Sequence, residues 1–212
     1  MKNAVFVSLF AALFFLAACN KDEPDPTPPE ESVLDYYPLA VGNYWVYQRS
    51  RCDSAWGSCD ALDTDTSRIV KDTLINNKTY YKIISFTELG TKSIGFLRDS
   101  LDYIVSSTGN IILSNKDFET VLKEKYEVFN EDTIYYYYAK MYEVMIPVET
   151  PAGNFECLDY KISLFTKKDN FEKETGIHHL FAKGIGPVFS QAIYLFSEGG
   201  YKLELVDYHI NK

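Results

Sequence analysis

The strongest constraint on the fold is the regular recurrence of strand-forming segments along the chain. From residue 43 onward, stretches rich in tyrosine, isoleucine, valine, phenylalanine and threonine recur every 8 to 15 residues. Turn-forming sequences separate them, among them Asn76-Asn77, Thr108-Gly109-Asn110, Pro151-Ala152-Gly153-Asn154 and Gly199-Gly200. This pattern is typical of an antiparallel sheet. Strands are expected at 43–50, 66–75, 78–87, 92–98, 101–106, 110–114, 124–130, 132–148, 154–167, 177–183, 187–197 and 200–210.

Two of these segments change the face on which their apolar residues fall. In 154–167 the apolar residues move from odd positions, ending at Cys157, to even positions, starting at Leu158. In the last segment the same change occurs between Leu205 and Val206. A change of phase inside a strand indicates a β-bulge or a sharp bend, and such bends let a long sheet curl. We therefore predict a mainly β fold with a strongly curved antiparallel sheet or open β-barrel; a β-sandwich is the alternative.

Only two stretches have a helix-like pattern. Lys116 to Lys125 carries three apolar residues at helical spacing, which predicts a short helix. A second helical turn is expected around Ser32 to Pro38. Residues 33–212 contain no further linker or low-complexity stretch, so we expect a single β-rich domain with one or two short helices.

The composition excludes two classes of protein. Aromatic residues make up 16% of the 212 residues, and a wholly disordered chain lacks that much apolar surface. The net charge is −9, and residues 33–212 carry 19 basic against 25 acidic residues. Because a nucleic-acid-binding protein needs a basic surface, we expect no nucleic-acid partner.

The N-terminal segment has the pattern of an export signal. Lys2 precedes an apolar run from Ala4 to Ala18, which is too short to span a bilayer as a helix. The run ends in Leu16-Ala17-Ala18-Cys19, which resembles the lipobox of bacterial lipoproteins. This resemblance implies that residues 1–18 are a signal peptide and that Cys19 is the lipidated first residue of the mature protein. The alternative is a secretory signal followed by an unrelated cysteine.

Residues 19–32 are expected to be a lipidated, disordered tether. Four of the eight prolines fall in this stretch, which favours an extended and unpacked chain. Lys21-Asp22-Glu23 resembles the export signal of Bacteroidota lipoproteins destined for the outer face of the outer membrane, and a solvated charged spacer is the alternative. The resemblance implies a protein held at the outer membrane by its N-terminal lipid and exposed at the cell surface; otherwise the protein faces the periplasm.

Three segments of the expected domain resemble uncharacterised Bacteroidota lipoproteins. The first runs from Tyr36-Tyr37-Pro38-Leu39 through Gly42-Asn43 to Trp45-Val46-Tyr47, the second is Pro151-Ala152-Gly153-Asn154-Phe155-Glu156-Cys157, and the third is the alanine- and glycine-rich run 182–188. Such proteins are similar in architecture to curled-sheet carriers of lipids or lipoproteins. The resemblance implies a curled sheet and carries over no activity.

Cys52 and Cys59 lie in a polar segment between two expected strands. Their short separation predicts a disulfide, because cysteine pairs of exported proteins stay oxidised. Trp56 lies inside this loop and is interpreted either as a contact for a partner or glycan, or as a ring that folds back onto the sheet. Nearby aspartates could hold a calcium ion, but their spacing departs from the regular calcium loop, so we expect no metal site.

Tyr135, Tyr136, Tyr137 and Tyr138 place two rings on each face of an expected strand. One interpretation is a stacking platform for sugar rings or an aromatic-lined groove. The other is buried core on one face and a cross-strand aromatic ladder on the other. The lone Cys157 is interpreted as a small buried hydrophobic residue.

No nucleotide-binding, zinc-protease or serine-hydrolase motif occurs in the sequence, and no cofactor is expected. We therefore expect a lipid-anchored envelope protein that binds an apolar or glycan ligand without catalysis. The candidate contacts are Trp56, Tyr135, Tyr136, Tyr137 and Tyr138. Two alternatives stay open: a structural or assembly subunit of a surface complex with a protein partner, and a hydrolase whose carboxylates come from separate strands.

Replacing Cys19 with alanine tests the lipid anchor. Without the thiol no thioether to a lipid can form, so Cys19→Ala should appear in the soluble fraction of lysed cells, whereas the wild type sediments with membranes. Membrane fractionation measures this, with Asn20→Ala as the matched control. Sedimentation of the Cys19→Ala protein to the wild-type extent would reject the anchor.

Overall fold

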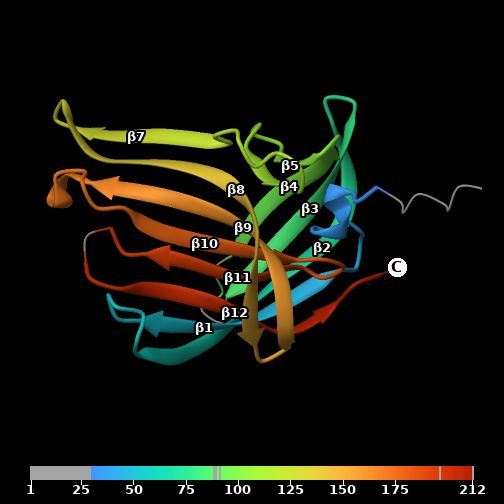
Figure 1. The fold of residues 1–212 in the computed structure, drawn as a ribbon. Helices are drawn as coiled ribbons and strands as arrows, with labels where there is room; N and C mark the ends of the chain where they lie inside the picture. Colours follow the sequence, from blue (N-terminus) through green and yellow to red (C-terminus); the bar gives the residue numbers. More distant parts are fainter. Residues whose placement is uncertain (1–29, 88–89, 91, 196, 212) are drawn as a thin grey trace, which may run out of the picture. The chain divides into compact units, whose positions relative to one another are not determined.

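The computed structural model describes residues 30–87, 90, 92–195 and 197–211 (Figure 1). The expected signal peptide, Cys19 and most of the expected tether lie outside the described residues. One compact unit begins at Glu31 and contains the β-rich part of the chain. Among the described residues, no helix is long and apolar enough to cross a membrane.

Twelve strands lie in the described part of the chain, and all twelve correspond to expected segments. The largest difference is that β2 begins at Cys59 rather than at residue 66. Two short 3-10 helices, η1 (Val33–Asp35) and η2 (Lys167–Asp169), accompany them. The strands are β1 (Tyr44–Cys52), β2 (Cys59–Ile75), β3 (Lys78–Thr87), β4 (Lys92–Ser100), β5 (Tyr103–Ser106), β6 (Ile111–Ser114), β7 (Lys123–Phe129), β8 (Asp132–Thr150), β9 (Gly153–Thr166), β10 (Thr175–Ala182), β11 (Gly186–Ile193) and β12 (Gly200–His209).

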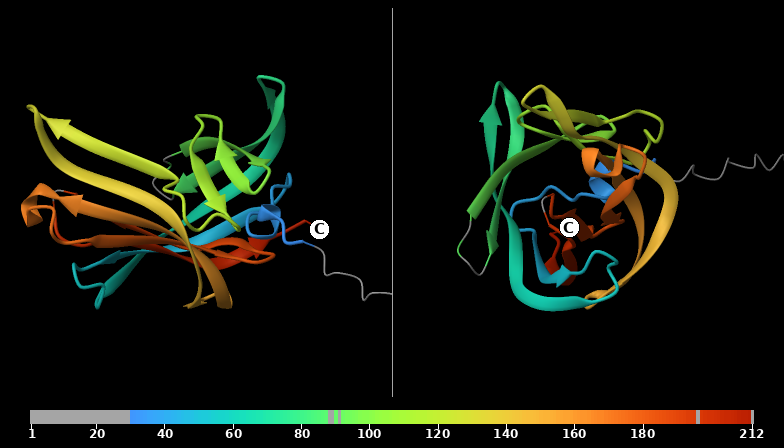
Figure 2. Two further views of the ribbon diagram at one scale, coloured as in Figure 1. Left: turned by 45° about the horizontal axis from the view of Figure 1, so that its top comes forward. Right: turned by 90° about the vertical axis from the view of Figure 1, so that its left-hand side faces the viewer.

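The strands form one antiparallel sheet in the order β6-β5-β4-β3-β2-β1-β12-β11-β10-β9-β8-β7. The first strand pairs with the last along its whole length, from Tyr44 opposite His209 to Cys52 opposite Gly200. The two edges are β6 and β7, which follow each other in the chain and do not pair within the described residues. The sheet curls nearly into a barrel, with one seam between these edges, as Figure 2 shows from the end. The predicted curved sheet is confirmed.

The phase change predicted in the last strand is a β-bulge. Val46 of β1 pairs with Asp207 of β12, and the next residue, Tyr47, pairs with Leu205. Val206 is therefore an extra residue in β12. Such a bulge increases the local twist and bends the strand, which helps the sheet to close.

The second predicted phase change marks a bend shared by β8 and β9. Tyr142 pairs with Asp159 and Ile146 pairs with Cys157, so three residues of β8 lie opposite Leu158 alone. Beyond this irregularity the β8–β9 hairpin turns away from the barrel wall and crosses β10 to β12 in Figure 1.

The bent hairpin covers part of the outer face of the sheet. The Ala152 N–H in its turn donates a hydrogen bond to the Leu205 carbonyl at 3.0 Å. Cys157 is fully buried and belongs to the hydrophobic core, and burial raises the pKa of its thiol to about 12. The interpretation of Cys157 as a buried hydrophobic residue agrees with this environment.

The segment before β1 packs into one end of the barrel. A capping box starts η1: the Leu34 N–H donates to Ser32 Oγ at 3.2 Å, and the Ser32 N–H donates to the Asp35 carboxylate at 3.0 Å. Tyr37 then packs edge-on against Trp45, with 5.8 Å between ring centroids, and lies 6.0 Å from the ring of Phe181. The helical turn expected around Ser32 is confirmed.

Trp45 is the fully buried centre of this end. Its Nε1–H donates to the Ile185 carbonyl at 2.8 Å. Gly186 has φ +103°, and a Cβ added there would lie 3.2 Å from the indole, so glycine is required for both reasons. Two of the segments that resemble Bacteroidota lipoproteins, the first and the third, thus pack directly against each other.

The helix expected at Lys116–Lys125 is wrong. The stretch consists of bends until β7 begins. Ser114 Oγ accepts hydrogen bonds from two backbone N–H groups that follow it, and the Asp117 carboxylate accepts two more. These side-chain bonds compete with helical backbone bonds. Phe118 and Leu122 still pack against the core, so the spacing of the apolar residues indicated burial rather than a helix.

Replacing Trp45 with phenylalanine tests the closed end. The change removes part of a fully buried side chain and leaves the Ile185 carbonyl without its donor, so the free energy of unfolding should fall by about 2–4 kcal/mol. Urea denaturation followed by circular dichroism measures this. Trp56→Phe, at a half-buried position, is the control and should cost less than about 1 kcal/mol. Equal losses for the two variants would contradict the packing described here.

Candidate functional site

Two adjoining pockets lie on the inner face of strands β8 to β11. The deeper one, of about 350 Å³, reaches the closed end and is lined by Tyr37, Ile112, Lys123, Tyr160, Ile162, His179, Phe181, Pro187, Phe189 and Ser190. The second, of about 290 Å³, is lined by Tyr135, Tyr137, Ile162, Leu164, Ile177, His179, Gln191, Ala192, Ile193 and Leu195. The pockets share Ile162 and His179, so they adjoin, and their walls are mostly apolar and aromatic.

A third pocket continues this cavity to the rim of the barrel. It has a volume of about 210 Å³ and shares Tyr135, Ile193 and Leu195 with the second pocket. Its other walls include η2 and the segment after β11, which lie at the end opposite η1 in Figure 1. Along β11 the track runs from Pro187 to Ile193, about 20 Å at ~3.3 Å per residue. The three pockets together form an elongated track, which we call the interior track.

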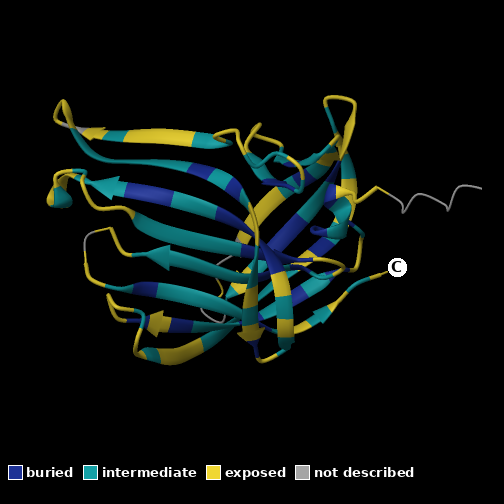
Figure 3. Cartoon of the chain, viewed as in Figure 1, coloured by how far each residue is buried: buried dark blue, intermediate teal, exposed yellow. Residues whose placement is uncertain are grey.

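Strand alternation divides the four consecutive tyrosines between the two faces of β8. Tyr135 and Tyr137 line the interior track. On the other face, Tyr136 stacks on Phe165 with 4.8 Å between ring centroids and on Tyr126 with 5.6 Å. The outer face is therefore a cross-strand aromatic ladder, and Tyr126 at its edge is 57% exposed, on the largely exposed strand β7 (Figure 3).

The polar groups in the deep pocket are few and mostly neutral. His179 Nδ1 lies 2.7 Å from Ser190 Oγ. Burial lowers the pKa of His179 to about 4, so its imidazole is uncharged at neutral pH. Burial also raises the pKa of Tyr160 to about 12, which keeps its hydroxyl protonated. Lys123 completes the set, with its Nζ 5.5 Å from the centroid of the Tyr137 ring.

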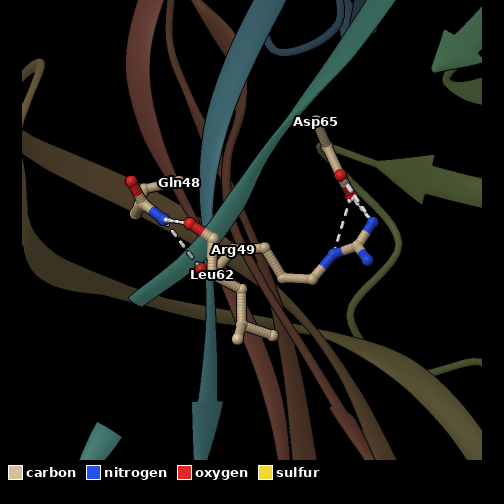
Figure 4. Close-up of polar contacts among 4 residues, drawn as sticks. All are labelled: Gln48, Arg49, Leu62 and Asp65. Atoms are coloured by element: carbon tan, nitrogen blue, oxygen red, sulfur yellow. Dashed lines mark hydrogen bonds and ion pairs between the residues drawn. The ribbon is translucent and has the colours of Figure 1, made fainter. Parts of the chain in front are cut away.

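Arg49 and Asp65 form an ion pair on the opposite part of the sheet (Figure 4). Arg49 Nη2 lies 2.5 Å from Asp65 Oδ1, and Arg49 Nε donates to Asp65 Oδ2 at 3.2 Å. Alternation along β1 puts Arg49 on the same face as the buried Trp45 and Tyr47. Hydrogen bonding to the carboxylate raises the pKa of the guanidinium, and the pair adds no net charge to the interior.

The predicted disulfide joins Cys52 to Cys59 across the β1–β2 hairpin. Trp56, in the loop that this disulfide closes, is half-buried with φ +57°. A Cβ added to Gly200 would lie 3.0 Å from its ring, so the indole lies over the start of β12. This position matches the alternative in which the ring folds back onto the sheet, and a ligand contact at Trp56 remains a prediction.

His178 and His179 point to opposite faces of β10 and have different partners. His178 Nδ1 lies 2.8 Å from Asp159 Oδ2, whose side chain is almost completely buried. Asp159 Oδ1 has no hydrogen-bond partner among the described residues. In the described part of the chain, no group of three or more histidine, cysteine, aspartate or glutamate residues is placed to hold a metal ion.

The hydrolase alternative requires carboxylates that face each other in a cleft. Among the described residues, those that line the two inner pockets include no aspartate or glutamate. A separate pocket of about 410 Å³ at the β8–β9 hairpin is lined by Glu149 and Glu156 among others, and both residues are exposed. An exposed carboxylate pair lacks the apolar surroundings that would tune one of them as a general acid.

Sequence reasoning found two of the residues in the interior track and missed the others. Tyr135 and Tyr137 were candidate contacts, whereas Lys123, Ile162 and His179 were not. The alternation in β9 predicts that Ile162 faces the same way as its even-numbered neighbours, but alternation alone does not distinguish a filled core from an open cavity.

The chain shows a distant likeness to two solved structures. No family model and no curated protein sequence matches it. A protein of Bacteroides fragilis, assigned as exported and with a YmcC-like fold, is 12% identical with a TM-score of 0.45, and the match covers 80% of this chain and 96% of that one. A protein of Parabacteroides distasonis, assigned as a lipoprotein, is 13% identical with a TM-score of 0.42, over 81% and 96% of the two chains. Both TM-scores are below 0.5, so the site rests on this chain's own residues.

The lowered pKa of His179 predicts how stability depends on pH. Between the pKa of an unfolded histidine, about 6.5, and that of folded His179, about 4, the unfolded chain binds a proton that the folded chain excludes. The stabilisation that neutral His179 gives the folded state is therefore fully present above pH 6.5. As the pH falls from 7 to 5, protonation of His179 in the unfolded chain should lower the free energy of unfolding by about 2 kcal/mol.

Urea denaturation of the wild type and of His179→Asn at both pH values measures this contribution. From pH 7 to pH 5 the free energy of unfolding of the wild type should fall by about 2 kcal/mol more than that of His179→Asn. The other titrating groups are the same in the two proteins, so their effects cancel in this difference. His209→Asn changes an exposed histidine and should follow the wild type. An unchanged pH dependence in His179→Asn would show that His179 is not buried in its neutral form.

Proposed function

We propose that the protein is a lipid-anchored envelope protein that binds a ligand with a long apolar body in the interior track. The observation that carries this proposal is that the three adjoining pockets share lining residues, from the floor at Tyr37 and Phe181 to the rim at Leu195. Binding sites for small molecules are usually concave and mostly apolar, with a few placed polar groups. The interior track has this character.

The energetics favour an apolar chain over a sugar. Each buried methylene contributes about 0.8 kcal/mol, so about ten of them give roughly 8 kcal/mol. This is of the same order as the cost of association, about 4–15 kcal/mol. A sugar would need a hydrogen bond for each of its hydroxyls. In the second pocket the side chains of Ile162, Leu164, Ile177, Ala192, Ile193 and Leu195 offer none, so the polar groups there are confined to Tyr135, Tyr137, His179 and Gln191.

The anchor and the location belong to the same proposal. The lipobox-like sequence ending at Cys19 would tie the mature N-terminus to a membrane. Residues 20–32 could then extend about 40 Å at ~3.1 Å per residue, enough to hold the β-rich unit clear of the headgroups. The Lys21-Asp22-Glu23 sequence favours the outer face of the outer membrane, and protease treatment of intact cells would decide which face is occupied.

Filling the interior track with a larger side chain tests the proposal. Ile162 lines both inner pockets, so Ile162→Trp should weaken binding of a neutral apolar probe, N-phenyl-1-naphthylamine. A misfitting bulky group costs about 1–3 kcal/mol, which corresponds to a loss of affinity of roughly 5- to 150-fold. Probe fluorescence in a titration measures the dissociation constant. Ile94→Trp makes the same change at an exposed position of β4 and should bind as the wild type does.

Circular dichroism must show that Ile162→Trp is folded at the assay temperature. If the folded variant binds the probe with wild-type affinity, or if the wild type does not bind it, the interior track is not the binding site that we propose.

A further inference from the structure

Lys123 lies at the seam and points into the barrel. It is the first residue of β7 and pairs with Ala139 of β8, whose side chain is fully buried in the core. Paired residues share a face of the sheet, so the lysine side chain is directed inward. It lines the deep pocket together with Ile112 of β6, the strand at the other edge of the seam.

Among the described residues that line the two inner pockets, Lys123 is the single formally charged one. Two other cations on inward faces have carboxylate partners: Arg49 binds Asp65 at 2.5 Å, and Lys125 binds Glu127 at 2.7 Å. Lys123 contacts the face of the Tyr137 ring, and no carboxylate of the described residues pairs with it. The deep part of the interior track therefore carries one positive charge for which the described residues supply no carboxylate partner, whereas Lys168 and Asp169 line the third pocket at the rim.

An unneutralised ammonium beside an apolar cavity favours an anion. Removing a charge from water is costly unless a partner replaces the lost solvation, and a charge-assisted hydrogen bond is about twice as strong as a neutral one. The Ser190 and Tyr160 hydroxyls lie in the same pocket and can donate further hydrogen bonds to a bound oxygen. The chain as a whole is acidic, so this attraction is local to Lys123.

The charge balance selects the headgroup. Lysine is a compact point charge of +1, which one carboxylate neutralises, whereas a phosphate monoester would bring up to two negative charges. The excess charge would remain in the pocket, whose other polar groups, such as His179 and Ser190, are neutral.

We propose that the ligand is a single-chain amphiphile with a carboxylate head, and that Lys123 binds this head in the deep pocket while the alkyl chain follows the interior track toward the rim. This inference rests on the proposed function and adds the headgroup class and the residue that selects it. A fatty acid has this chemistry.

Competition with N-phenyl-1-naphthylamine at pH 8 tests the headgroup. Dodecanoate should displace the probe from the wild type at a concentration at least about tenfold lower than dodecan-1-ol, which has the same chain without charge. Dodecanoate and dodecan-1-ol should displace the probe from Lys123→Met at similar concentrations. The variant should bind dodecan-1-ol with the affinity of the wild type. Retained alcohol binding shows that the variant is folded and the apolar part of the site intact.

Lys125→Met is the matched control, because it removes a lysine from the same face of the same strand but one that is paired with Glu127. It should keep the preference for dodecanoate. A wild type without that preference, or a Lys123→Met variant that keeps it, would overturn the role of Lys123 while leaving the proposed function standing. Tighter binding of dodecyl phosphate than of dodecanoate would overturn the inference that the headgroup of the ligand is a carboxylate. Failure of every compound and of the probe to bind the wild type would instead refute the proposed function.

Discussion

The pairing of β1 with β12 is the contact on which the rest of the structure depends. It joins the first and last strands along nine residues of β1 and turns a simple up-and-down order of strands into a nearly closed ring. Once these strands pair, the free edges must be β6 and β7, which are consecutive in the chain. The seam, and the inward-pointing lysine at the start of β7, follow from that topology. Backbone hydrogen bonds between distant parts of the chain therefore decide where the unusual charge lies.

The two ends of the ring differ because different segments fill them. At one end, Tyr37 packs against both Trp45 and Phe181 beside the tight Gly186 turn and forms the floor of the deep pocket. Toward the other end the wall side chains of β8 to β11 leave the interior track open. A barrel of twelve strands is wider than its own side chains can fill, since barrel diameter grows with strand number. The segment before β1, which includes Tyr37, fills the extra space at one end of the barrel alone.

The strands were predictable because their signals are local. Alternating apolar residues and turns such as Asn76-Asn77, both at positive φ, are visible in the sequence, and so were the phase changes at Cys157 and Val206. The helix at Lys116 was predicted wrongly, because apolar spacing cannot reveal that Ser114 and Asp117 take up the backbone N–H groups. The interior track was beyond prediction in detail. It depends on which inward residues of separate strands meet. The described part of the chain also places no carboxylate against Lys123, and both features follow from the register between strands far apart in sequence.

The central claim is that an apolar ligand occupies the inside of the barrel. Methyl spectra of protein labelled at the isoleucine methyl groups report this directly when dodecan-1-ol is added. The account predicts saturable shifts at Ile162, Ile177 and Ile193, which line the interior track, and unchanged positions for the outward or exposed Ile84 and Ile94. Shifts confined to Ile84 and Ile94, or no saturable shift at the three inner isoleucines, would contradict it.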